Sequence, residues 1–147
     1  MSSTGVPPQD ALDDAAQPAA PYTVATRSQA LDFMAEYPAF GEMRWYSDAL
    51  GTEQVSFSWR RMAPGTGGRG SYGHCHPGQE EVYFVIAGTV TFKIGEDVFE
   101  AGPQTAVRVA GDAMRSLHND TGQEAELLVF SRRLAEPPVE RQEGFWP

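Results

Sequence analysis

A chain of 147 residues, 41% of them hydrophobic and 21% charged, has the size and composition of a single soluble globular domain. Its formal net charge of −9 argues against nucleic acid or an anionic membrane surface as the main partner. The single cysteine, Cys75, excludes an intramolecular disulfide, so the fold does not depend on an oxidising compartment.

The N-terminal stretch, residues 1–21, is rich in Pro, Ala, Asp and Ser and has little to bury, which predicts a disordered arm. It has neither a basic start nor an apolar run, so it does not resemble a secretory signal. No apolar segment of the chain is long enough to cross a bilayer. We therefore expect a cytoplasmic protein.

A short helix is predicted over the stretch SQALDFMAEYP. Ser28 is a candidate N-cap, and Pro38 would end the helix. Leu31, Met34 and Ala35 would form its apolar stripe, which predicts that this face packs against the rest of the domain.

From Glu53 onward the hydrophobic residues recur with a period of two, which indicates β-strands. The predicted strands are VSFSWRRM, EVYFVIAG, TVTFKI, VFEA, TAVRV, MRSLHN and AELLVFS. Gly, Pro, Asp and Asn separate them, and APGTGGRGSYG is predicted to be a loop. Short strands at intervals of roughly ten residues are typical of a β-sandwich or barrel, so an all-β fold is expected.

This pattern divides the chain into a disordered arm over 1–21, a helix and lead-in strand over 22–52, a barrel over 53–133 and a C-terminal tail over 134–147. The tail has two adjacent prolines and no regular period. Its Phe145 and Trp146 are large apolar side chains that could cover a hydrophobic patch.

The stretch GHCHPGQEEVYFVIAG places two of the three histidines around the only cysteine. Because side chains alternate along a strand, His74 and His76 should face one side and Cys75 the other. Two imidazoles about 7 Å apart on one face can converge on one ion. Glu81 then completes a set of two histidines and one carboxylate, which holds a divalent first-row metal and leaves coordination positions open.

Simpler interpretations exist for the same residues. His74 and His76 could be polar side chains at an exposed strand end. Glu80 is the other candidate carboxylate, although a solvated position beside Glu81 suits it better. Cys75 faces away from the histidines, and because no second cysteine is present a packed thiol is favoured over a redox switch.

Residues 68–88 resemble the first conserved motif of the cupins, in which a glycine, a His-x-His pair, a glutamate and a second glycine stand at fixed spacing. These positions are filled here by Gly68, His74, His76, Glu81 and Gly88. The resemblance covers roughly residues 53–133 and implies a single jelly-roll β-barrel with the metal inside it. It also favours Glu81 over Glu80, because only Glu81 leaves the second glycine in place.

The second cupin motif normally supplies a histidine as the fourth ligand, and here it is incomplete. Laid over AVRVAGDAMRSLHND, the motif places Arg115 at the histidine position and Asn119 at its asparagine. His118 is an alternative fourth ligand, but alternation sends it outward if Arg115 faces inward. A slip of one residue that turned His118 inward would also move Leu117 to the other face, which a buried strand resists.

An inward Arg115 beside a metal would be costly to bury without an anion. A substrate carboxylate or phosphate would satisfy it, which makes Arg115 a candidate substrate anchor. The structural alternatives are a pair with Asp112 or Glu80, or a position at the barrel mouth. Tyr72 and Tyr83 share the parity of the proposed ligands, so they could line the pocket or simply fill the barrel.

The resemblance thus implies a cupin that binds Fe, Mn, Ni or Zn through His74, His76 and Glu81. It would be a metal-dependent oxygenase, isomerase or lyase acting on a small anionic or carbonyl metabolite. The alternative is a non-catalytic cupin that binds a small molecule and has a structural metal or none. Many small cupins are homodimers, so a homodimer is expected, with no nucleic-acid or membrane partner.

Overall fold

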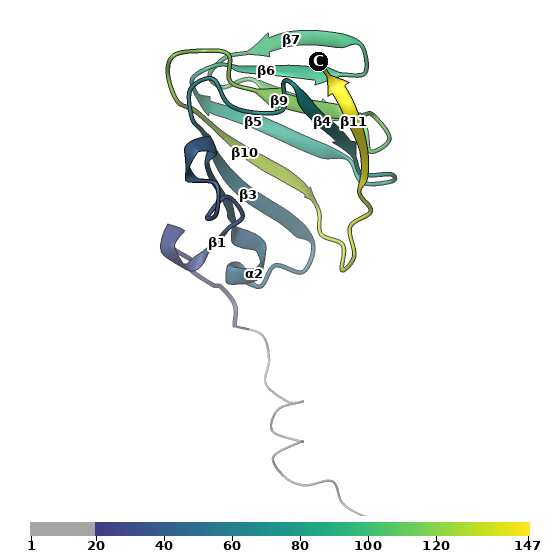
Figure 1. The fold of residues 1–147 in the computed structure, drawn as a ribbon. Helices are drawn as coiled ribbons and strands as arrows, with labels where there is room; N and C mark the ends of the chain where they lie inside the picture. The colour runs from purple at the N-terminus through teal and green to yellow at the C-terminus, as the bar shows by residue number, and fades with distance from the viewer. Residues whose placement is uncertain (1–19) are drawn as a thin grey trace, which may run out of the picture.

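The computed structural model describes residues 20–147, so the predicted disordered arm lies almost wholly outside the described residues. The strands are β1 (Leu31–Asp32), β2 (Gly41–Trp45), β3 (Val55–Met62), β4 (Ser71–Cys75), β5 (Glu81–Ala87), β6 (Val90–Ile94), β7 (Asp97–Ala101), β8 (Ala106–Val109), β9 (Arg115–His118), β10 (Ala125–Arg132) and β11 (Glu140–Trp146). The helical elements are the 3-10 helices η1 (Arg27–Gln29) and η2 (Pro38–Phe40) and the α-helix α2 (Tyr46–Leu50). Figure 1 shows these elements in sequence order by colour.

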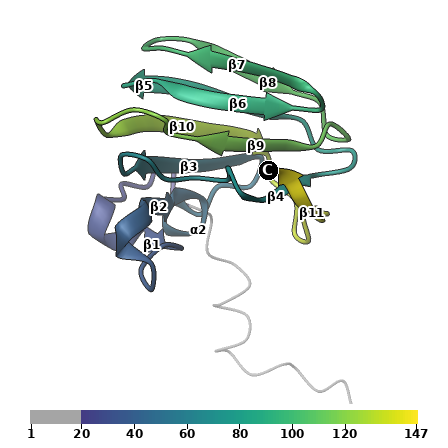
Figure 2. The ribbon, with the colours of Figure 1, turned by 45° about the horizontal axis from the view of Figure 1, so that its top comes forward.

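Two antiparallel sheets form the domain. One has the strand order β1-β2-β3-β10-β5-β8, and the other has the order β11-β4-β9-β6-β7. Several consecutive strands, such as β4 and β5, therefore lie in different sheets, as in a jelly roll. Figure 2 shows the stacked strands, with β1, β2 and α2 at one end and β7 and β8 at the other. The prediction of a single all-β jelly-roll barrel is confirmed.

Every strand predicted from the period-two pattern is found in one of the two sheets. The buried side chains of these strands form one core. In β5, for example, Tyr83 and Val85 are 4% and 0% exposed and pack in this core. The core side chains are Met62, Tyr83, Val85, Val90, Phe92, Ala101, Val107, Val109, Leu117, Ala125 and Leu127. Gly88 closes the turn from β5 to β6 with φ of 75°, and a Cβ there would lie 2.5 Å from the carbonyl oxygen of Glu124. The second motif glycine is therefore required by backbone packing.

The helix predicted over residues 28–38 is wrong. The chain forms η1, the short strand β1 and then a turn instead. Oδ1 of Asp32 accepts hydrogen bonds from the backbone N–H groups of Met34 and Met43, each at 2.9 Å. These bonds tie the turn to β2 and compete with helix formation. Leu31, which the helix would have buried, is 62% exposed.

The C-terminal tail contains a strand that the sequence pattern does not reveal. β11 pairs with β4 along the edge of its sheet. Phe145 and Trp146 are 6% and 5% exposed, so the prediction that they cover an apolar patch is confirmed. Gly73 lets Phe145 approach, because a Cβ at this position would lie 2.4 Å from the Phe145 ring.

A buried carboxylate ties the N-terminal segment to the sheet. Glu42 of β2 forms ion pairs with Arg27, Arg44 and Arg61 and is 7% exposed. The hydrogen bond from Arg27 is the largest of the effects that lower the pKa of Glu42 from 4.5 to about 2. Within the described residues no helix has the length and apolar character needed to span a membrane.

Candidate metal centre

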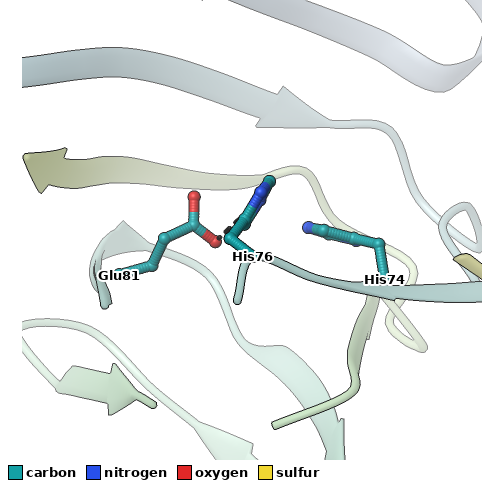
Figure 3. A group of neighbouring side chains, drawn as sticks. All are labelled: His74, His76 and Glu81. Atoms are coloured by element: carbon teal, nitrogen blue, oxygen red, sulfur yellow. Dashed lines mark ion pairs between the residues drawn. The ribbon is translucent and has the colours of Figure 1, made fainter. Parts of the chain in front are cut away.

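The three side chains predicted to hold a metal come together at one end of the barrel. His74 lies in β4, His76 follows β4 directly, and Glu81 begins β5. One ligand atom from each lies within 4.8 Å of the other two. Figure 3 shows His76 between Glu81 and His74, and the two imidazole centroids are 5.0 Å apart. The prediction that the two histidines share a face is confirmed.

His76 is oriented by the tail. Its Nδ1 lies 2.8 Å from the carbonyl oxygen of Pro138, which can only accept, so Nδ1 carries the proton. Nε2 is then left with its lone pair, and it lies 3.7 Å from Oε1 of Glu81. A backbone carbonyl that fixes the tautomer in this way is a common partner of a metal-ligating histidine.

His74 is held in its neutral form by its surroundings. Burial, followed by the nearby charges of His76 and of three arginines, lowers the pKa of His74 from 6.5 to about 4. The arginines are Arg115, Arg60 and Arg141. At neutral pH the imidazole therefore keeps a free lone pair. A neutral imidazole is the form that binds a metal.

Glu81 is surrounded by hydrogen-bond donors. The hydroxyl of Tyr83 donates to its Oε1 at 2.6 Å, and Nη2 of Arg115 lies 3.4 Å from the same oxygen. Burial, followed by the charge of Glu81, raises the pKa of Tyr83, so this hydroxyl stays protonated and remains a donor. Tyr83 thus both fills the barrel and contacts the candidate centre.

Arg115 lies beside two of the three side chains, His74 and Glu81. It pairs with His74 across the β4–β9 ladder and is 0% exposed. Nη1 donates to the carbonyl oxygens of Ala113 at 3.0 Å and Gly111 at 3.4 Å. Nε and Nη2 have no hydrogen-bond partner among the described residues. Arg115 is therefore not at the barrel mouth, and that alternative is wrong. It does pair with a local acid, but this acid is Glu81 and not Asp112 or Glu80.

His118 lies on the opposite face of β9 from Arg115, as strand alternation predicted. Its Nδ1 accepts the backbone N–H of Arg69 at 3.3 Å, and its Nε2 lies 3.5 Å from Asp120. The ring packs edge-on against Trp146, with centroids 6.1 Å apart. His118 is outside the group of side chains that could share a metal, so it is not a fourth ligand in this arrangement.

The neighbours of the motif have structural roles. Glu80 is 62% exposed along its side chain and pairs with Arg108 at 3.1 Å, so the expectation of a solvated neighbour is confirmed. Cys75 is 3% exposed on the other side of β4, and its burial raises the pKa of the thiol, as expected of a packed cysteine. Tyr72 is 40% exposed and stacks against the Arg141 guanidinium at 3.6 Å.

A cavity of about 390 Å³ opens beside the centre, and His76 and Glu81 form part of its wall. The lining also includes the buried polar side chain of Gln79 and, near the N-terminal segment, the aromatic rings of Phe33 and Trp45. A space of this volume accommodates a small molecule. The two candidate ligands therefore face a space that such a molecule could enter.

Two features of the site are absent from the sequence prediction. The Pro138 carbonyl reaches His76 only because β11 folds back along β4, and no sequence pattern marked that strand. Arg60 is the other feature. The sequence does indicate that Arg60 points inward, because it alternates with Ser58 and Met62 on the buried face of β3.

The donor set fits a divalent first-row ion. Two imidazoles and one carboxylate converge, and Nδ1 of His76 is fixed by a carbonyl. Arg115 takes the place where the cupin resemblance expected a fourth ligand, so the described residues offer three candidate ligands. Open coordination positions would then remain for water or for a small molecule from the cavity.

The Cupin domain family matches residues 58–131, just over half of the chain, and this chain therefore belongs to the cupins. No curated protein matches the sequence.

Solved structures of cupins share the fold at low sequence identity. The polyketide cyclase RemF from Streptomyces resistomycificus has a TM-score of 0.64 at 16% identity, covering 85% of this chain and 87% of that one. A cupin protein from Bacteroides fragilis has a TM-score of 0.61 at 17% identity, covering 80% and 88%. A sugar phosphate isomerase from Silicibacter pomeroyi has a TM-score of 0.58 at 21% identity, covering 69% of this chain and 64% of that one, under two thirds of its length. These likenesses establish the fold.

Proposed function

We propose that this cupin is a metal-dependent enzyme that acts on a small carbonyl or anionic compound. The observation that carries the proposal is the convergence of His74, His76 and Glu81 to within 4.8 Å. Two of them, His76 and Glu81, form part of the wall of a cavity of about 390 Å³. A bound divalent ion supplies Lewis acidity and open coordination positions. The metal is Fe, Mn, Ni or Zn, all of which accept this mixed nitrogen and oxygen donor set.

The residues around the three ligands support their role. His76 is held by the Pro138 carbonyl with Nε2 directed to Glu81, and His74 stays neutral at physiological pH. The Tyr83 hydroxyl fixes the Glu81 carboxylate. The ligands are therefore positioned before an ion arrives, which reduces the cost of ordering them.

Two reaction types suit three protein ligands. Oxygen-dependent oxidation needs two open positions, one for the substrate and one for O₂. Isomerisation or lyase chemistry needs one open position and a base. Solved cupins with the same fold include a sugar phosphate isomerase and a polyketide cyclase, and these activities are described for those proteins. They support the second type as a candidate for this scaffold.

The test is turnover by the reconstituted protein. The full chain is loaded separately with Fe(II), Mn(II), Ni(II) and Zn(II) and incubated with small oxo acids and sugar phosphates, while O₂ uptake and product formation are measured. The proposal predicts turnover that is lost in Glu81→Gln and kept in Glu80→Gln, whose side chain pairs with Arg108 at the surface. Metal binding with no turnover of any compound would contradict an enzymatic role and leave a binding protein.

A further inference from the structure

Arg60 points into the barrel. It belongs to β3, where the alternate residues Ser58 and Met62 are 7% and 0% exposed, and it shares their face. Its neighbour Arg61 points outward and pairs with Glu42 and Glu124. The two adjacent arginines therefore point to opposite faces of the sheet, and of the two only Arg61 has carboxylate partners among the described residues.

The Arg60 side chain forms no ion pair and no hydrogen bond within residues 20–147, and it is only partly exposed to solvent. A partly buried guanidinium without a partner is unfavourable because its hydration is lost without replacement. Nearly every other arginine of the barrel has a carboxylate or a carbonyl within reach. The Arg60 guanidinium is thus a hydrogen-bond donor on the inner face of the barrel that has no acceptor among the described residues.

Arg115 presents a second set of free donors nearby. Its Nη1 is occupied by carbonyl oxygens, but Nε and Nη2 make no hydrogen bond, and the residue is 0% exposed. Nε and Nη2 form one edge of the planar guanidinium, and this edge binds a carboxylate or phosphate through two parallel hydrogen bonds. Nη2 lies 3.4 Å from Oε1 of Glu81, so the free edge is beside the candidate ligand set.

The two arginines lie around the same histidine. Arg115 stands opposite His74 in the register of β4 and β9. Arg60 is the next inward residue after Ser58, which is in register with Val129 and Tyr83 across β3, β10 and β5. Arg60 therefore lies on the same inner face as Tyr83, whose hydroxyl donates to Glu81. Arg141 approaches His74 from β11 but is 55% exposed along its side chain and already pairs with Glu143. Arg60 and Arg115 are therefore the inner pair of this cationic group.

We propose that Arg60 and Arg115 form an oxyanion-binding site beside His74 that receives a carboxylate or phosphate group of the substrate. The inference rests on the proposed function, because it names the substrate class of the same centre. The substrate is then an anion whose charged group contacts the arginines while a neighbouring oxygen reaches the metal ligands. In this proposal Arg60 is an additional residue that determines specificity, because it selects substrates with an anionic group.

The charges of the site agree with an anionic ligand. Glu81 is the carboxylate that meets Arg115, and it offsets one of the two guanidinium charges. Arg60 has no carboxylate partner among the described residues, so one guanidinium charge remains without an offsetting carboxylate. An anion that is buried among these groups is stabilised strongly, because few water molecules compete for the same donors.

The test is the binding of two simple anions to the metal-free full chain. Inorganic phosphate and malonate are titrated separately by calorimetry into the wild type and into R60M, R60K and R108M. Arg108 is a matched control because it is 65% exposed along its side chain and pairs with Glu80 at the surface. We expect R60M to weaken binding about tenfold, which corresponds to about 1.4 kcal/mol, with a smaller loss in R60K and none in R108M.

The preferred anion indicates the chemical class of the substrate. Tighter binding of phosphate indicates a phosphorylated substrate, and tighter binding of malonate indicates a carboxylic acid. Equal binding by the wild type and R60M, or no binding to the wild type, would overturn the proposal. Circular dichroism of R60M and the result for R60K guard against a loss caused by misfolding. The double variant H74A/H76A separates the two proposals, because it should lose the metal and still bind the anion.

Discussion

Nδ1 of His76 donates a hydrogen bond of 2.8 Å to the carbonyl oxygen of Pro138, sixty-two residues further along the chain. The C-terminal tail is thereby part of the candidate metal centre, because it determines which nitrogen of His76 faces Glu81. The tail is held in place by β11, which pairs with β4, the strand that carries His74. Metal binding and packing of the tail should therefore be coupled.

The first prediction concerns this hydrogen bond. Replacing Pro137 and Pro138 by glycine should loosen the segment and weaken metal affinity roughly tenfold, the lower end of the range for partners of metal ligands. Competition with a chelating dye measures the affinity. Pro64→Gly, in the loop after β3, is the matched control and should leave affinity unchanged. Equal affinity in the tail variant and the wild type would show that Pro138 does not orient His76.

The second prediction concerns the residue that stands at the fourth-ligand position. Arg115→His should bind a divalent metal at least about tenfold, or about 1.4 kcal/mol, more tightly than Arg115→Met, because only the histidine adds a ligand. Both variants remove the repulsive guanidinium charge, so the comparison isolates the imidazole. Calorimetric titration with Zn(II) measures the difference. Identical affinities would show that a histidine at position 115 does not reach the bound metal.

The third prediction concerns the Tyr83 hydroxyl, which donates to Oε1 of Glu81 at 2.6 Å. Tyr83→Phe should weaken metal affinity by about tenfold and lower the free energy of unfolding by about 1 kcal/mol, because a buried hydrogen bond is lost. Tyr72→Phe removes a hydroxyl from an exposed ring and serves as the control. If both variants bound metal alike, Tyr83 would be a packing residue only.

The fourth prediction concerns stability against acid. The pKa of Glu42 is lowered from 4.5 to about 2, so its ion pairs stabilise the folded state fully above pH 4.5 and progressively less as the pH falls towards 2. Glu42→Gln should lower the free energy of unfolding by roughly 1.5–3 kcal/mol at pH 7. Thermal unfolding from pH 2 to pH 7 measures this difference, which should shrink below pH 4.5.

The matched control for Glu42 is Glu124→Gln. Glu124 also pairs with Arg61, but its side chain is 58% exposed, and an exposed pair contributes little. A pH-independent difference between Glu42→Gln and the wild type would contradict the assignment of the acid sensitivity to Glu42.

The fold could be predicted from sequence because the strands of the barrel alternate strictly. Tyr83 and Val85 point into the core, as their period-two spacing required, and the same rule placed Arg115 inward and His118 outward. The candidate ligands were found because His74 and His76 share a strand face. Local spacing was sufficient for these features, since each depends on only one strand or one turn.

The features that were missed depend on contacts between distant segments. The helical pattern around Leu31 was overridden by Asp32, whose carboxylate caps the turn and bonds to β2. The strand β11 has an irregular pattern because five of its residues are exposed at a sheet edge. The inward direction of Arg60 follows from its parity in β3, but its place near the candidate ligands depends on the pairing of β3, β10 and β5, which local spacing does not give.

The central claim is that His74, His76 and Glu81 hold a metal ion, and elemental analysis of the untagged protein tests it most directly. The wild type, the double variant H74A/H76A and the control His118→Ala should be purified in parallel and reconstituted with the same ions. The account predicts one equivalent of iron, manganese, nickel or zinc in the wild type and in His118→Ala, and none in H74A/H76A. Equal metal content in all three proteins, or no metal in the wild type after reconstitution, would contradict it.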